Sequence, residues 1–277
     1  MSSLVVNSNL SAISAYNNLN ATDQAMTTAI SQLSSGLKIQ TAADNPAGYV
    51  TAEALQSQSN GYQQAISNAQ NGVSLIQTAS GALNQVISIL QTMNSLALNS
   101  ANSATTDAAS QSANQSEFAA LQSQIDTIAG TTSFGTTNLL DGSFSGTLQV
   151  GAFNYGSNQI GLQITSVTTT ALSLTSSSVS ISSLGSAQAA ITAVQNAISQ
   201  VASEEASLGA KQNELQAVVS NLTVGQQNLQ SAYSGLVDVN FAQATTTYST
   251  DQILMQSGVS MLSQAQQTPG MVLKLLQ

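Results

Sequence analysis

The side chains that carry most enzyme chemistry are absent from this sequence. Its 277 residues include no cysteine and no histidine, which removes thiol nucleophiles, disulfides, imidazole bases and nearly every zinc or haem site. The carboxylates of Glu204 and Glu205 are adjacent, but neighbouring residues on a helix point about 100° apart and do not form a catalytic dyad. The sequence also lacks a glycine-rich phosphate loop. It therefore predicts a protein that is not an enzyme and binds no metal or cofactor.

Charge is scarce along the whole chain. Charged residues make up 5% of the sequence, against about 25% in an average globular protein. Three lysines face twelve acidic residues, for a net charge of −9, so no basic stripe exists that could neutralise phosphates. We therefore expect no nucleic-acid partner. Three explanations of the low charge stay open: acidic surroundings, where carboxylates are protonated and ion pairs are useless, lineage drift, or a Ser/Thr surface meant for glycans.

The first residues do not resemble a cleaved export signal. They lack the basic region and the apolar core of a secretory signal peptide, and no window approaches 18 uninterrupted apolar residues. The sequence predicts no membrane insertion. If the protein leaves the cell, we expect it to do so without a cleaved signal peptide.

Apolar residues recur at alternating steps of three and four in three long segments. The segments lie near 46–100, 107–129 and 187–236, and this spacing is typical of helices that pack against partner helices. Asn45 and Pro46 are suited to start the first segment, and Thr106 to cap the second. We predict a mainly α fold in which residues 45–237 form a long antiparallel helical bundle. Its predicted core contains Ile66, Val73, Ile76, Leu83, Leu90, Leu121, Ile198, Leu208, Leu215, Leu222 and Leu229.

Between the second and third segments the period changes from helical to two. Residues 147–150 and 159–164 alternate apolar and polar side chains around a turn rich in Gly and Asn, which predicts a small β-hairpin region at about 138–165. A Ser/Thr-rich segment at about 165–186 follows and could be strand or loop. Its hydroxyls are candidate O-glycosylation sites, namely Thr168, Thr169, Ser176 and Ser177.

The two ends of the chain have the same character. The terminal segments 1–44 and 238–277 form one predicted domain. In it, residues 1 to about 37 predict one amphipathic helix with almost no charge, followed by a linker up to Asp44. The second segment predicts another such helix, with Pro269 and Gly270 kinking or restarting it. We expect the two helices to pair as a terminal coiled coil and, since each is marginal alone, to be largely disordered until assembly. The predicted coiled-coil residues are Tyr16, Leu19, Met26, Ile30, Leu33, Leu37, Phe241, Tyr248, Met255, Leu262, Val272 and Leu276.

Five blocks, in order along the chain, resemble the bacterial flagellins. They are Gln32-Leu-Ser-Ser-Gly-Leu-Lys-Ile39 with Ala43-Asp44-Asn45-Pro46-Ala47-Gly48, then Asn71-Gly-Val-Ser-Leu-Ile-Gln-Thr-Ala-Ser-Gly-Ala-Leu-Asn84, Phe134-Gly-Thr-Thr-Asn-Leu-Leu-Asp-Gly142, Leu208-Gly-Ala-Lys-Gln-Asn213 and Gln252-Ile-Leu-Met-Gln-Ser-Gly258. The resemblance implies a structural subunit that polymerises with itself into the extracellular flagellar filament for motility. It implies that the terminal coiled coil forms the inner part of the filament, and that residues 45–237 form the next layer outwards.

The same resemblance implies partners beyond the chain itself. These are hook-associated and cap proteins, an export chaperone and the type III-like flagellar export apparatus. Many flagellins carry large outer domains where this chain has only the segment at about 165–186, so the resemblance is to a short, minimal type. A hook–filament junction protein, which shares flagellin-like ends, is the alternative that the sequence leaves open.

Overall fold

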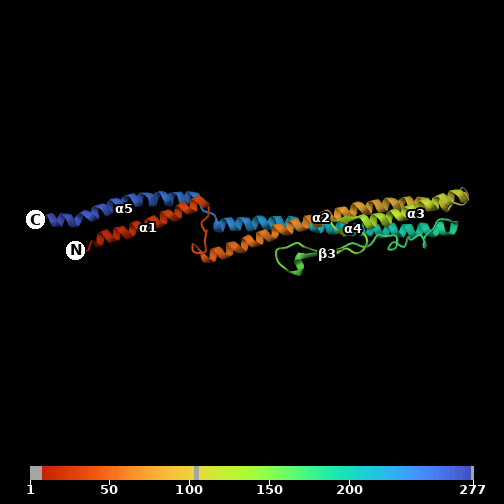
Figure 1. Cartoon of the computed structure of the whole chain (residues 1–277), viewed down its shortest axis with the longest axis horizontal. Helices are drawn as coiled ribbons and strands as arrows, with labels where there is room; N and C mark the ends of the chain where they lie inside the picture. The colour runs from red at the N-terminus through yellow and green to blue at the C-terminus, as the bar shows by residue number, and fades with distance from the viewer. Residues whose placement is uncertain (1–7, 103–105, 276–277) are drawn as a thin grey trace. The chain divides into compact units, whose positions relative to one another are not determined.

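A computed structural model describes residues 8–102 and 106–275, and it is built mainly from helices (Figure 1). This confirms the predicted fold class of long helices with a small antiparallel strand region. In chain order the elements are α1 (Leu10–Ser35), α2 (Pro46–Ser100), α3 (Ala108–Thr131), β1 (Ser133–Phe134), β2 (Thr137–Asn138), β3 (Ser145–Gln149), the 3₁₀ turn η1 (Gly156–Asn158), β4 (Gln159–Gln163), α4 (Leu184–Val237) and α5 (Phe241–Leu275).

The chain divides into two compact units. The terminal unit combines the chain up to Ser57 with the chain from Asn228 onwards, and the bundle unit is Gln58–Gln227. Both boundaries therefore lie inside long helices, α2 and α4, whereas the division expected from the sequence lies at helix ends.

Capping side chains set the starts of α2 and α3. Asn45 starts α2 as predicted, because its Oδ1 accepts a hydrogen bond from the Gly48 backbone N–H at 2.9 Å. At α3 the prediction was wrong: Asp107 is the cap and accepts from the Ser110 N–H at 2.7 Å. Thr106 instead donates its hydroxyl to the Asn99 carbonyl. The predicted restart at Pro269 does not occur, since α5 continues to Leu275.

The core of the bundle unit joins α2, α3 and α4 with the hairpin and the Ser/Thr-rich segment. Most of the predicted core residues are buried; these are Ile66, Ile76, Leu83, Leu90, Leu208, Leu215 and Leu222. Val73, Leu121 and Ile198 are half-buried and pack against the same core, and Leu229 is half-buried in the terminal unit. Helix α2 is long and apolar enough to cross a membrane by length and composition, and its buried apolar residues between Ala69 and Ala97 line this core.

The predicted hairpin is present and rests on α2. Strands β3 and β4 pair antiparallel from Ser145 with Gln163 to Gln149 with Gln159. Asn68 on α2 donates its side-chain amide to the Gln149 carbonyl at 3.0 Å. Glycines make room on either side of this bond: a Cβ at Gly61 would lie 2.6 Å from the Ala152 Cβ, and a Cβ at Gly72 would lie 2.4 Å from the Leu148 Cδ1. The hairpin can lie close to α2 because these positions carry no side chain.

The Ser/Thr-rich segment is an ordered loop held by α3. Gln122 is buried and donates its side-chain amide to the Leu174 carbonyl at 2.6 Å. Asp126 accepts hydrogen bonds from both the backbone N–H and the hydroxyl of Thr169, each at 2.8 Å. The side chains of Leu172, Leu174, Val179 and Ile181 enter the core. Turns of this kind need no regular strand, which is why the periodicity of this segment gave no clear prediction.

This arrangement corrects one predicted glycosylation site. Thr169 is buried and its hydroxyl is bonded to Asp126, so the side chain is closed to a glycan. Thr168 is half-buried and shares a hydrogen bond with the Ser166 hydroxyl. Ser176 and Ser177 are exposed, although the Ser176 hydroxyl donates to Gln122 at 2.9 Å. The Ser177 hydroxyl lies 3.1 Å from the Thr175 hydroxyl.

Candidate assembly surface

The terminal unit is organised by the antiparallel pair of α1 and α5 (Figure 1). Their backbones approach each other more closely than those of any other pair of described helices. The facing positions repeat at steps of three and four; they are Ala12, Ala15, Leu19, Thr22, Met26, Ala29 and Leu33 on α1, and Ala244, Tyr248, Asp251, Met255, Gly258, Leu262 and Ala265 on α5. Half of these residues are Ala, Gly or Thr, and such small side chains allow a close approach.

Backbone and side-chain hydrogen bonds fix the pair at both ends. At one end the Asn9 side-chain amide donates to the Ala265 carbonyl at 2.7 Å. At the other end the Lys38 N–H donates to the Val237 carbonyl and the Val239 N–H to the Gly36 carbonyl, at 2.6 and 2.8 Å. Gly36 adopts a left-handed conformation with φ of 77°, which ends α1 and turns the chain towards this contact. These bonds fix the antiparallel register.

The structure corrects part of the predicted coiled-coil seam. Leu19, Met26 and Leu33, with Tyr248, Met255 and Leu262, lie between the two helices as expected, and Leu37 forms an isolated bridge with Asp238 beyond the end of α1. Three predicted seam residues are instead exposed, namely Tyr16 at 55%, Ile30 at 48% and Phe241 at 57%. For Tyr16 and Ile30 the reason is that Ala15 and Ala29, one residue earlier, occupy the close contact. The Phe241 ring lies near Gly36, where a Cβ would be 3.9 Å from its Cζ. The predicted Val272 and Leu276 lie outside the side chains that the structure describes.

Large apolar side chains therefore remain on the outer sides of both helices. We call this set the terminal apolar surface; it consists of Leu10, Ile13, Tyr16, Ile30, Phe241, Ile253, Leu254, Val259 and Met261, each about half exposed or more. Single exposed apolar residues are ordinary on a soluble protein, but a large set concentrated on two helices is typical of an interaction surface.

The polar residues on these helices are almost all neutral. Between Leu10 and Ser35, and between Phe241 and Gln267, the only charged residues are Asp23 and Asp251. A run of hydroxyl residues near the start of α5 donates to the carbonyls four residues earlier, at 2.6 to 3.1 Å. Because these hydroxyls already have partners, burying them against another chain would leave fewer polar groups unsatisfied.

Asp251 is the exception within the seam. Its Oδ2 atom is buried and has no hydrogen-bond partner, although the residue occupies a facing position on α5. Sequence periodicity missed this position because an acidic residue does not count towards an apolar seam. An unpaired buried carboxylate oxygen weakens the helix pair in which it lies.

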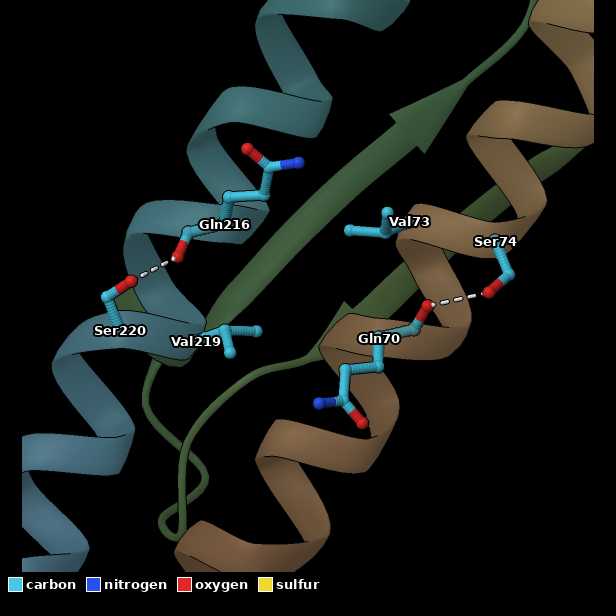
Figure 2. Close-up of a pocket in the computed structure, with 6 residues that line it drawn as sticks. All are labelled: Gln70, Val73, Ser74, Gln216, Val219 and Ser220. Atoms are coloured by element: carbon cyan, nitrogen blue, oxygen red, sulfur yellow. Dashed lines mark hydrogen bonds between the residues drawn. The ribbon is translucent and has the colours of Figure 1, made fainter.

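A shallow groove lies between α2 and α4 on the bundle unit (Figure 2). It has a volume of about 430 Å³ and is lined by Gln70, Val73, Ser74, Gln216, Val219 and Ser220. Figure 2 shows the β3–β4 hairpin passing behind the two helices, so the groove opens on the other face. None of the lining residues is charged.

The acidic residues considered for chemistry have separate structural partners. Glu204 accepts hydrogen bonds from the backbone N–H and hydroxyl of Thr165, whereas Glu205 accepts from the Asn84 side chain at 2.8 Å. Lys211 pairs with Glu214 at 2.9 Å on the surface of α4. Within the described ranges, no group of three or more potential ligands is placed to hold a metal ion. Glu204 thus connects α4 to the start of the Ser/Thr-rich segment, and Glu205 connects α4 to α2.

Comparison with known proteins shows the family to which the sequence is related. Residues 6–145 match the model of the bacterial flagellin N-terminal helical region, and residues 191–276 match that of the C-terminal helical region. The chain is 38% identical to a flagellin of Halalkalibacterium halodurans over 99% of this chain and 100% of that protein. It is 34% identical to a flagellin of Bacillus subtilis over 98% and 99%. The crystal structure of Bacillus cereus flagellin superposes with a TM-score of 0.50 at 27% identity, over 60% of this chain and 94% of that one.

Proposed function

The chain belongs to the bacterial flagellin family, and we propose that its α1–α5 pair joins neighbouring subunits through the terminal apolar surface. Flagellins are the structural subunits of the extracellular flagellar filament, so this chain is a filament subunit that serves motility. Its short Ser/Thr-rich loop stands where larger outer domains occur in other flagellins. The proposal concerns how this particular chain makes the polymer.

The observation that carries the proposal is the terminal apolar surface itself. Burying exposed apolar area stabilises an interface by about 25 cal/mol per Å², and nine large side chains on α1 and α5 are exposed in the single chain. A contact between different patches on successive copies does not close on itself and produces a helical filament. The near absence of charge on these helices means that few ions must be desolvated when the copies meet.

We propose that α1 and α5 become stably helical only in the polymer. Among the described side chains of the two helices, only Ala29 and Ala244 are buried, so the pair on its own removes little apolar area from water. Ordering a residue costs about 1–2 kcal/mol of backbone entropy, and most of the stability of a helix in a protein comes from packing of its apolar face. Contacts with neighbouring copies would supply the missing burial. The predicted inner coiled coil of residues 1–44 and 238–277 then forms as part of assembly.

Loosely ordered ends also suit the route by which the chain would reach the filament. We propose export through the type III-like flagellar apparatus, with an export chaperone covering the apolar ends and without a cleaved signal peptide. Hook-associated and cap proteins would meet the first and last subunits of the polymer. We propose no catalytic activity, no nucleic-acid partner and no membrane insertion, which agrees with the sequence chemistry.

A polymerisation assay tests the role of the terminal apolar surface. Ile253→Ser with Met261→Ser changes two exposed side chains, so the bundle unit should keep its helix content by circular dichroism. We expect the concentration needed for filaments, followed by sedimentation and electron microscopy, to rise at least tenfold. Gln256→Ser, at an exposed polar position on the same helix, is the matched control and should assemble like the parent. Equal assembly by all three proteins would overturn the proposal.

The hook–filament junction alternative is not favoured, because full-length similarity runs to flagellins. A junction protein would be present in few copies and would not form long polymers by itself. Long filaments of the purified chain exclude it.

A further inference from the structure

The loop between β3 and β4 carries two exposed aromatic rings. Phe153 and Tyr155 are 49% and 63% exposed, and their ring centroids lie 5.9 Å apart at a tilt of 48°. We call these two residues the aromatic tip. Aromatic side chains bring a large apolar area at low entropy cost and are enriched where interfaces gain most of their energy.

Hydrogen bonds hold the loop that presents the aromatic tip. The Gln149 side-chain amide donates to the Gly151 and Phe153 carbonyls at 3.0 and 2.9 Å. The Asn158 side-chain amide donates to the Phe153 carbonyl at 2.9 Å. A loop fixed in this way loses little further freedom when it binds, so the aromatic tip is preorganised for a partner. No charged residue lies between Val150 and Gln163.

The groove between α2 and α4 offers complementary chemistry. Its floor is formed by the half-buried Val73 and Val219. On its rim, the Ser74 and Ser220 hydroxyls donate to the carbonyls of Gln70 and Gln216, at 3.1 and 3.0 Å (Figure 2). The two serine hydroxyls therefore already have hydrogen-bond partners, and the side-chain amides of Gln70 and Gln216 can bind the hydroxyl of a tyrosine such as Tyr155. A hollow of about 430 Å³ is within the range that takes groups as large as a small molecule, which is enough for two aromatic rings.

We propose that the aromatic tip of one chain docks in the α2–α4 groove of a second copy. A chain cannot fill its own groove, because its tip is seated against Gly61 through Ala152 and the hairpin passes behind the helices that form the groove (Figure 2). Tip and groove are different patches, so the contact propagates from copy to copy without closing. The inference rests on the proposed function, which supplies the neighbouring copies, and it names a contact made by the bundle unit.

Cysteine cross-linking tests the contact directly, since the chain has no cysteine of its own. Tyr155→Cys protein is mixed with Ser74→Cys protein, copolymerised with excess parent chain and oxidised mildly. We expect a disulfide-linked dimer on non-reducing gels. In the control, Ser207→Cys replaces Ser74→Cys; Ser207 is exposed on α4, about half a helical turn round from Gln216, and should give at least tenfold less dimer. Equal yields from both mixtures, or none from either in well-formed filaments, would overturn the proposal.

A second pair of variants measures what the contact contributes. Phe153→Ala with Tyr155→Ala removes the rings, and Ser220→Trp fills the groove from an exposed position. We expect each to raise the critical concentration for filaments about tenfold or more, with helix content unchanged by circular dichroism. If both variants assemble like the parent, the tip does not dock in the groove, although filament formation still stands. If the parent itself forms no filaments, the proposed function fails first.

Discussion

The glycines beneath the hairpin give the sharpest stability prediction for this flagellin. Gly61 lies on α2 directly under Ala152 of the hairpin loop. A Cβ at Gly61 would lie 2.6 Å from the Ala152 Cβ and 3.1 Å from its Cα. Neither atom belongs to a flexible side chain that can rotate away, so Gly61→Ala must displace the hairpin backbone. Gly81 on the same helix has no atom within 4 Å of its hypothetical Cβ and is the matched control.

The two substitutions share one helix and one chemical change, so their difference isolates the clash. Replacing glycine by alanine inside a helix gains about 1 kcal/mol, whereas overpacking a fitted contact costs about 1–3 kcal/mol. We expect Gly81→Ala to stabilise the bundle unit by about 0.5–1 kcal/mol. Gly61→Ala should be neutral to destabilising by about 2 kcal/mol. In a unit of this size, the gap of about 0.5–3 kcal/mol between the variants corresponds to about 1–12 °C in melting temperature.

Urea and thermal unfolding of the unassembled chain, followed by circular dichroism, measure this gap. Both variants should keep the helix content of the parent, because the change lies in the contact between helix and hairpin. If Gly61→Ala stabilises the chain as much as Gly81→Ala does, the hairpin does not rest on α2 at this position. The aromatic tip would then not be held against α2 in the way described.

Three further predictions concern polar side chains. Gln122→Leu should lower the free energy of unfolding by about 1–3 kcal/mol in a urea titration, because the buried Leu174 carbonyl loses its hydrogen-bond donor. The control Gln124→Leu, at an exposed position of α3, should change the free energy of unfolding by no more than about 0.5 kcal/mol. Asp251→Leu removes the unpaired buried oxygen and should stabilise the α1–α5 pair by about 1 kcal/mol, which lowers the critical concentration for filaments. A higher critical concentration would contradict this, and so would an equally lowered one for Asp23→Leu at an exposed position. Hydrogen bonds from the Ser110 side chain and backbone lower the pKa of Asp107 below its usual value. The Asp107 carboxylate therefore stabilises the folded chain above the unfolded pKa of about 3.9. This stabilisation is lost as the pH falls through the lower pKa of the folded chain. Asp107→Asn keeps a capping side chain and should flatten the decline of stability in that window; an unchanged acid limb would refute the assignment.

The long helices could be predicted from sequence because their signal is local and repeated. Periodic apolar residues, with Asn45 and Pro46 at the start of α2, place α2, α3 and α4 to within a few residues. What periodicity could not supply were contacts between distant residues. The seating of the hairpin depends on Gly61 meeting Ala152, and the order of the Ser/Thr-rich loop depends on Gln122 reaching Leu174. Neither glycine nor glutamine gives a periodic signal.

The seam between α1 and α5 shows a different limit. Reading the largest apolar residues as the buried ones selects Tyr16 and Ile30, yet Ala15 and Ala29 face α5. Close approach of two helices favours small residues at the contact and leaves large neighbours outside. Those outward residues are the ones that a polymer can use. The difference between prediction and structure therefore lies at the surface assigned to assembly.

The central claim is that α1 and α5 gain their stable partners from other copies of the chain. Hydrogen exchange of the backbone amides of Leu10–Ser35, measured in the unassembled chain and again in sedimented filaments, tests it most directly. We expect the amides of α1 to exchange fast in the free chain and at least a hundredfold more slowly in the filament. The α2 amides should be strongly protected in both. Protection of α1 in the free chain equal to that of α2 would contradict it.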